Sequence, residues 1–192
     1  MIETILLSML AAKLKRYKLS PLFKAWPIYF IISFEVIYIV LQVELFKGNY
    51  SVLKYTGNME KPFLCLFLIL ALKYRQYISA IIGSGCILTG GFLNDIVISA
   101  NNGKMPVFPT LSYLTGYADT WVSGNLKDIH TLGTASTDLK FLSDIFDLGY
   151  CIMSVGDIFI RLFVFIITFS IIKQINQEIG CTVIVDKENN PS

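Results

Sequence analysis

Long apolar stretches alternate with short polar connections along most of the chain. A helix that crosses a membrane needs roughly 20 mostly apolar residues. Stretches of that kind occupy 26–46, 78–100 and 155–172, and a shorter one at 62–73 reaches this length when it is extended to 55–74. The first stretch, 1–14, would be about 21 Å long as a helix, which suits a thinned bilayer or partial insertion. The pattern predicts an all-α protein, a polytopic membrane helix bundle of about five transmembrane helices.

The composition agrees with a membrane location. Apolar residues make up 54% of the chain and charged residues only 16%, whereas soluble domains average about 25% charged residues. This composition excludes a disordered chain, and a net charge of +2 gives no reason to expect a nucleic-acid partner. With one histidine and four scattered cysteines, we expect no zinc site, no other metal and no cofactor. The expected partner is the lipid bilayer.

Lysine and arginine in short connections set the orientation, because cytoplasmic loops are enriched in them. Five of these residues lie between the first two predicted helices: Lys13, Lys15, Arg16, Lys18 and Lys24. We therefore expect a multi-pass cell-membrane protein with its amino terminus outside and its carboxyl terminus in the cytoplasm. Residues 1–173 would form one transmembrane domain with an external loop at 101–154, and 174–192 a short, disordered cytoplasmic tail. Glu3 stands where a signal peptide carries positive charge, so we expect the first stretch to be retained.

Charged side chains inside the predicted spans need a partner or a role, because each costs at least about 2.5–3.5 kcal/mol at the membrane centre. Glu35, Asp95, Asp157 and Arg161 are in this position. Ser154 and Asp157 form an S-x-x-D capping box that would open the last helix. Arg161 follows Asp157 by four residues, so an Asp157–Arg161–Glu35 network is expected.

Small residues repeat along one face of the 78–100 helix. Ser79, Gly83, Cys86 and Gly90 are spaced four, three and four residues apart, which lets a neighbouring helix approach closely. Asn94 continues this face, and Asp95 is the next residue in the sequence. These two side chains either hold helices together or line a cavity that opens to the outside.

The loop at 101–154 is much longer than the usual connection, and such loops are often functional. Gly103 and Pro106 predict an ordered turn over 102–107, where the chain leaves the helix and passes over the bundle. Apolar residues spaced three and four apart predict a short helix over 138–148, either a surface anchor or a lid. We expect Asn102, His130 and Asp144 to form a polar patch above Asp95 and Asp157.

Four motifs in the second half of the chain carry a resemblance. They are Asn102-Gly103-Lys104-Met105-Pro106-Val107, His130, T-x-L-x-x-L-x-D ending at Asp144, and Ser154-x-Gly156-Asp157. The series resembles a bacterial integral-membrane family known only as a domain of unknown function. Its members read N-G-G-(K/R)-M-P-V, H, T-x-L-x-x-L-G-D and S-x-G-D. Here one glycine follows Asn102 instead of two, and Ser143 replaces a glycine. The resemblance covers most of the chain and implies a membrane fold, but no reaction.

A much weaker similarity is to signal peptidase II, an intramembrane aspartyl enzyme that trims lipoproteins. Gly90-Gly91 with Asn94 is similar to its G-G-x-x-x-N segment, and Val155-Gly156-Asp157 to its N-V-A-D segment. The first aspartate of that enzyme follows its asparagine by three residues, where this chain has Val97. Only the displaced Asp95 could take that role.

Two classes of function follow from these residues. The first is a protein that binds a ligand, or a protein or small-molecule partner, at the external face, through residues of the outer polar cluster: Asn94, Asn102, His130, Asp144 and Arg161. The alternative is an intramembrane aspartyl hydrolase at the outer leaflet, with Asp95 and Asp157 sharing acid and base roles. A small transporter subunit with Glu35 in its path is a third option.

Overall fold

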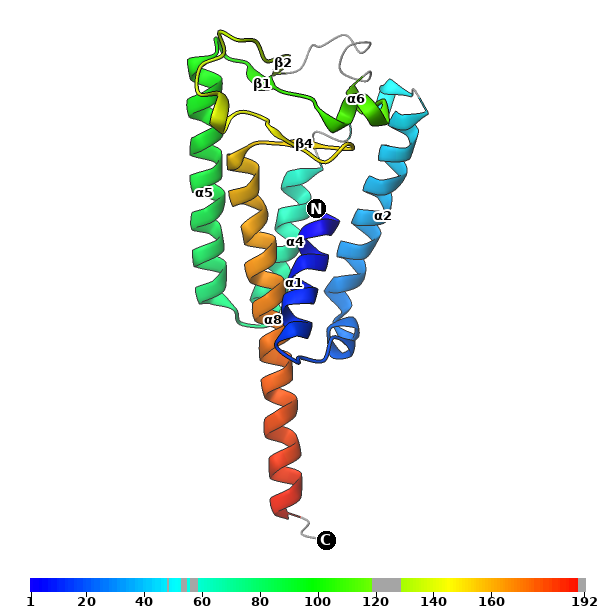
Figure 1. Cartoon of the computed structure of the whole chain (residues 1–192). Helices are drawn as coiled ribbons and strands as arrows, with labels where there is room; N and C mark the ends of the chain where they lie inside the picture. Colours follow the sequence, from blue (N-terminus) through cyan, green and yellow to red (C-terminus); the bar gives the residue numbers. More distant parts are fainter. Residues whose placement is uncertain (48, 53–54, 56–58, 119–128, 190–192) are drawn as a thin grey trace.

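The structure is a helix bundle that carries a small cap of short strands and turns at one end (Figure 1). This computed structural model describes residues 1–47, 49–52, 55, 59–118 and 129–189. The bundle consists of α1 (Ile2–Leu14), α2 (Trp26–Phe46), α4 (Glu60–Lys73), α5 (Tyr77–Ala100) and α8 (Val155–Asn189), with single 3-10 turns η1 (Ser20–Lys24) and η2 (Tyr50–Val52) between them. Each helix of the bundle covers one of the predicted apolar stretches.

Three of the described helices are long and apolar enough to cross a membrane. They are Trp26–Phe46, Tyr77–Ala100 and the Val155–Ile179 part of α8. The outward side of α5 is apolar, and Ile78, Ile81 and Leu88 each expose more than 70% of their surface. Such side chains suit contact with lipid. Helices α1 and α4 have 13 and 14 residues, fewer than the roughly 20 that a full span requires.

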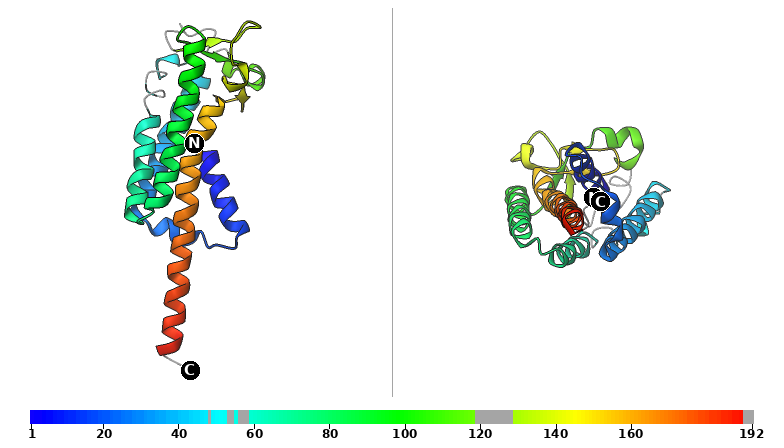
Figure 2. Two further views of the ribbon diagram at one scale, coloured as in Figure 1. Left: turned by 90° about the vertical axis from the view of Figure 1, so that its left-hand side faces the viewer. Right: turned by 90° about the horizontal axis from the view of Figure 1, so that it is seen from below.

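Helix α8 forms the centre of the bundle. It packs against α5, α1 and α4, as the view from below in Figure 2 shows. The shared core includes Phe67 of α4 and Phe163, Ile167 and Ile171 of α8, all at most 2% exposed. Helix α8 continues past its apolar part to Asn189, into the segment that the sequence analysis takes as a tail. No proline interrupts the helix before Pro191.

The predicted small-residue face of α5 is the contact with α8. An added Cβ at Gly90 would lie 2.3 Å from the backbone oxygen of Gly156, and one at Gly83 would lie 2.6 Å from the Phe163 ring. The Ser79 hydroxyl donates to Ser170 Oγ across the same contact at 2.9 Å. The two backbones therefore meet where Gly90 and Gly156 carry no side chain.

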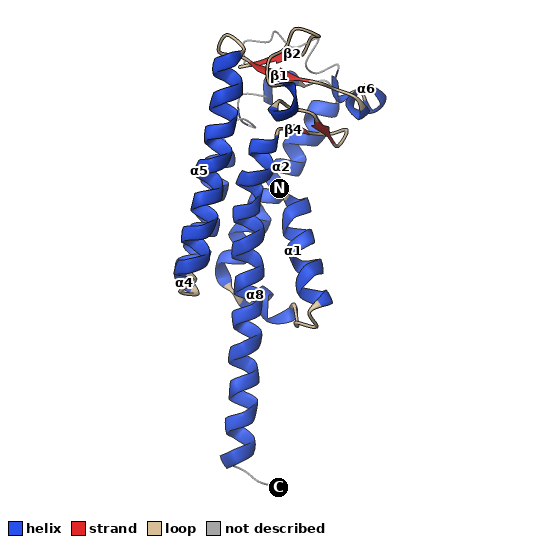
Figure 3. Ribbon diagram, turned by 60° about the vertical axis from the view of Figure 1, so that its left-hand side comes forward, coloured by secondary structure: helices blue, strands red, loops and turns tan. Residues whose placement is uncertain are grey.

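The cap closes one end of the bundle with two small sheets (Figure 3). Strand β1 (Met105–Val107) pairs in parallel with β2 (His130–Leu132), and β3 (Phe146–Asp147) pairs antiparallel with β4 (Ile152–Met153). A bridge between Val107 and Asp144 connects the two sheets. The short helix α6 (Leu111–Thr115) and the 3-10 turn η3 (Lys140–Leu142) complete the cap. Strand β4 runs directly into α8.

The prediction of a helix over 138–148 is wrong. This segment holds one 3-10 turn, η3, followed by strand β3. Leu139 adopts a left-handed conformation with φ of +52°, which interrupts a helix at its start. The Asp144 N–H then donates to the Pro106 carbonyl at 3.1 Å, and the Asp144 carbonyl accepts from Phe108. Pairing with β1 replaces the local helical hydrogen bonds.

The close approach of α5 and α8 predicts that alanine at Gly90 destabilises the protein, and the neighbouring Gly91 provides a control. Gly90→Ala should lower the free energy of unfolding by about 1–3 kcal/mol, because its methyl group would meet the Gly156 backbone. Gly91→Ala on the same helix meets nothing within 4 Å and should be neutral or slightly stabilising. Unfolding of both variants in mixed micelles with increasing denaturing detergent measures the difference. Equal stability of the two variants would contradict the observed helix contact.

Candidate functional site

The turn that leaves α5 is ordered, as the sequence predicts. Asn102 and Gly103 both have positive φ, +56° and +77°. The Asn101 side-chain amide donates to the Val97 carbonyl at 2.9 Å and to the Asp138 carbonyl at 3.0 Å. Met105 is buried immediately after the turn, whereas Asn102 itself is exposed at the surface. The turn therefore fixes β1 on top of the bundle.

His130 of β2 and the neighbouring Asp144 lie close together within the cap. His130 Nε2 lies 3.6 Å from Asp144 Oδ2, and Asp144 is only 3% exposed. Burial, together with the nearby charge of Asp157, raises the pKa of Asp144 to about 8. The Asp144 carboxyl is therefore mostly protonated at pH 7 and can donate a hydrogen bond.

Asn94, Ser154 and Asp157 form one hydrogen-bonded group where α8 begins against α5. Asp157 N–H donates to Ser154 Oγ at 2.9 Å, and Ser154 N–H donates to Asp157 Oδ2 at 3.0 Å. This pair is the predicted capping box. Asn94 joins it from α5, donating to Asp157 Oδ1 and accepting from the Ser154 hydroxyl. The carboxylate of Asp157 is thus occupied in holding two helices together.

The two candidate catalytic carboxylates lie in different surroundings. Asp157 belongs to the capping group, and Asp95 is exposed on the outer side of α5. This arrangement favours a structural role for Asp157. The structure instead places Asp144, from the cap, close enough to Asp157 for their charges to interact.

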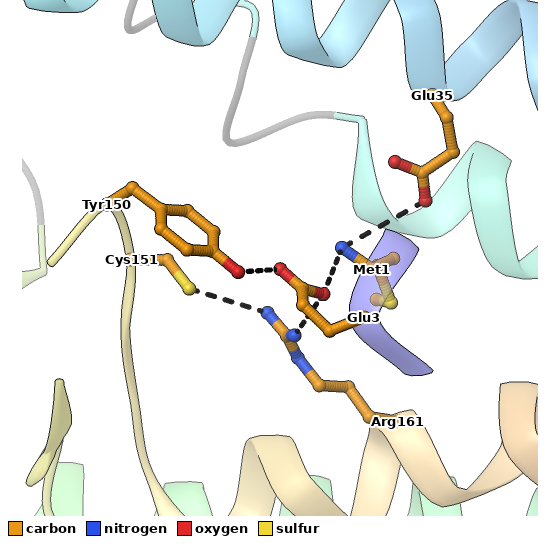
Figure 4. A network of polar contacts seen from close by, with 6 residues as sticks. All are labelled: Met1, Glu3, Glu35, Tyr150, Cys151 and Arg161. Atoms are coloured by element: carbon orange, nitrogen blue, oxygen red, sulfur yellow. Dashed lines mark hydrogen bonds and ion pairs between the residues drawn. The ribbon is translucent and has the colours of Figure 1, made fainter. Parts of the chain in front are cut away.

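Arg161 belongs to a second polar network, deeper in the bundle (Figure 4). The sequence predicts an Asp157–Arg161–Glu35 network. Arg161 Nη1 donates to Glu3 Oε2 at 3.1 Å, and Glu35 is connected to this pair through the Met1 ammonium. The Tyr150 hydroxyl donates a hydrogen bond to the other carboxylate oxygen of Glu3. Cys151 Sγ lies 3.9 Å from Arg161 Nη2. Glu3 of α1 is therefore the anionic partner of Arg161. Sequence reasoning used Glu3 only as evidence against a signal peptide, although a charge in an apolar stretch already signals a partner.

A groove of about 820 Å³ opens in the cap, and sequence reasoning did not find it. Its walls are mainly apolar and come from two parts of the chain, 107–113 and 132–145. The lining residues are Val107, Phe108, Pro109, Thr110, Tyr113, Leu132, Gly133, Lys140, Phe141 and Ile145. Lys140 is the charged residue of this lining, and its Nζ lies 4.5 Å from the centre of the Phe108 ring.

One wall of the groove is held by Asp147. Its carboxylate accepts hydrogen bonds from the Thr110 N–H at 2.6 Å, the Ser112 N–H at 2.8 Å and the Gly149 N–H at 2.7 Å. The Ser112 hydroxyl adds a fourth bond at 2.6 Å. Partial burial opposes ionisation, but these hydrogen bonds outweigh it and lower the pKa of Asp147. The ionised carboxylate fixes the position of α6 beside the groove.

The comparisons with known proteins identify a family. A model described as a family of unknown function, DUF5317, matches residues 20–169. The chain belongs to this DUF5317 family. The match covers α2, α4, α5, the cap and most of the apolar part of α8. No curated protein and no solved structure matches the chain.

Among the residues that the structure describes, no group of three or more His, Cys, Asp or Glu side chains could hold a metal ion.

The raised pKa of Asp144 predicts a pH dependence of stability. The folded protein keeps a proton on Asp144 up to pH about 8, whereas an unfolded aspartate loses it near pH 3.9. The contribution of Asp144 to the free energy of unfolding therefore falls as pH rises through this interval, by at most about 1.4 kcal/mol per pH unit.

Asp144→Asn should remove this contribution, so that wild type loses stability relative to the variant between pH 5 and 8. The exposed Asp138 gives a control, and Asp138→Asn should leave the slope unchanged. Unfolding curves at matched pH values measure both. A wild-type curve parallel to that of Asp144→Asn would show that Asp144 is ionised in the folded protein.

Proposed function

We propose that this DUF5317 protein binds a small amphiphilic molecule, apolar with one anionic group, in the groove of its cap. The observation that carries the proposal is the groove itself. Its volume of about 820 Å³ lies within the range of small-molecule sites, roughly 300–1,000 Å³. Its mixture of apolar walls and few polar groups is also typical of such sites.

The lining of the groove supports this class of ligand. Phe108, Phe141 and Ile145 offer apolar and aromatic surface, and Lys140 contributes positive charge. Lys140 rests over the Phe108 ring, a favourable position for a cation. An anionic group of a ligand would form a charge-assisted hydrogen bond with Lys140, while the rest of the ligand covers the apolar walls.

The sequence-predicted binding residues act in this proposal by shaping the groove. Asp144 bonds through its backbone to Pro106 and Phe108, and its side chain faces His130. Asn94 holds the start of α8, which follows β4. Asn102 belongs to the turn before β1, and Arg161 connects the bundle to the segment before β4. The use of Asp157 in the capping box favours binding over the hydrolase hypothesis.

We further propose five spans in the cell membrane of a bacterium, with the cap outside. Helices α1 and α4 would complete the bundle across a locally thinned bilayer, since α1 packs against α8 and α4 against both α2 and α8. The lysines and arginines of the connection between α1 and α2 favour a cytoplasmic position for the end opposite the cap. A groove on the cap would then face the external medium.

Cysteine labelling tests this orientation. Burial raises the pKa of the native Cys151 thiol and makes it a poor reporter, so the native cysteines are first replaced by alanine. Lys104→Cys, in the exposed turn of the cap, should react with an impermeant maleimide in intact cells. Lys15→Cys, in the exposed connection after α1, should react only after permeabilisation. The reverse pattern would place the cap in the cytoplasm.

Binding is tested with radiolabelled 2-naphthoate, a soluble aromatic carboxylate, by equilibrium dialysis against the protein in nanodiscs. Lys140→Gln should weaken binding by about tenfold, roughly 1.4 kcal/mol, because the anion loses its charged partner. Lys104→Gln removes a cap lysine outside the groove lining and should change affinity little. Binding equal to that of empty nanodiscs, or equal loss in both variants, would contradict a site in the groove.

A further inference from the structure

Glu35 is a buried acidic residue that the proposed groove does not use. It lies in α2, about 14 Å from the start of the helix and so near the middle of a span. The residue is 6% exposed, and both carboxyl oxygens are fully buried without a hydrogen-bond partner. A buried charge without donors is costly, because no water or dipole replaces its hydration.

Ionisable groups from several elements lie around Glu35, and Figure 4 shows five of the residues that carry them: Met1, Glu3, Tyr150, Cys151 and Arg161. From α1 come the Met1 ammonium, 4.0 Å from Glu35 Oε1, and Glu3; from α8 comes Arg161; from the segment before β4 come Tyr150 and Cys151; and α2 itself adds Tyr38. Helix α4 packs against α2 with apolar side chains such as Phe63, and its Lys61 and Lys73 are exposed near its two ends.

The hydrogen bonds of these groups go to Glu3 and not to Glu35, whose ion pair with the Met1 ammonium is longer. Arg161 and Tyr150 both donate to Glu3, and the Met1 ammonium lies 3.2 Å from Glu3 but 4.0 Å from Glu35. Glu3 thus has donors within hydrogen-bond distance, whereas the carboxyl group of Glu35 has none. Two like charges this close also oppose each other, so ionisation of Glu3 disfavours ionisation of Glu35.

We propose that Glu35 is an intramembrane proton-binding site. A proton taken up from the aqueous phase binds a carboxyl oxygen of Glu35 and gives a neutral acid, which suits a buried position without donors. Release of that proton leaves two carboxylates to share the Met1 ammonium and Arg161. Because Arg161 also contacts Cys151, and Glu3 binds Tyr150, the proton on Glu35 controls how firmly α1 and α8 hold the base of the cap.

Infrared spectroscopy of the full chain in nanodiscs tests this proposal, because a protonated carboxyl group has its own C=O stretching band. At pH 7 the wild-type protein should show the band of a protonated glutamic acid, and Glu35→Gln should lose it. Glu44→Gln is the matched control on the same helix, where an exposed carboxylate is paired with Lys47, and it should leave the band unchanged. Asp144→Asn separates the contribution of Asp144 from that of Glu35.

Selective ¹³C labelling of glutamate shows in the wild-type chain, without any variant, that the band belongs to a glutamic acid and not to an aspartic acid, and Glu35→Gln then assigns the band to Glu35. A labelled protein whose protonated-carboxyl band does not shift at pH 7 would overturn the proposal. So would a band that survives in Glu35→Gln. Stabilisation of wild type by sodium chloride, but not by choline chloride, with the glutamic acid band missing, would instead make Glu35 a cation site and also overturn it.

Discussion

The contact between Gly90 and Gly156 is the constraint on which the Asn94–Ser154–Asp157 group and the end of the cap depend. A side chain at either position would push α5 away from α8, since the space is filled by the backbone of the other helix. The close approach lets Asn94 reach across and bond to Ser154 and Asp157. The first turn of α8 is thereby fixed, and with it the end of the cap, because β4 leads directly into Ser154.

The position of α8 explains why a protonated aspartate can lie under the cap. Asp144 has to pair through its backbone with Pro106 and Phe108 for the two small sheets to join. That pairing buries its side chain near Asp157, whose negative charge is held by the capping box. Two ionised carboxyl groups there would repel each other, and the neutral form of Asp144 avoids this cost.

Local patterns in the sequence predicted the features that local physics decides. The apolar stretches, the capping box at Ser154 and the turn at Gly103 depend on residues a few positions apart, and each was found where it was expected. The segment 138–148 was missed because its apolar spacing suits a helix, whereas pairing with β1, over thirty residues away, decides its structure. The groove was missed for the same reason, since Val107, Leu132 and Lys140 meet only after the cap has folded. The partner of Arg161 was missed because α1 lies more than 150 residues away.

The network around Glu3 connects three parts of the molecule: α1, α8 and the segment that leads to β4. Helix α1 supplies the carboxylate, α8 supplies Arg161, and the segment leading to β4 supplies Tyr150. In a low-dielectric interior such bonds are strong while every member is satisfied, and a change of one charge affects all of them. Glu35 lies at the edge of this network with no donor of its own. A change in its charge would therefore be felt first at Glu3, then at Arg161 and Tyr150, and through Tyr150 at the segment that carries the cap.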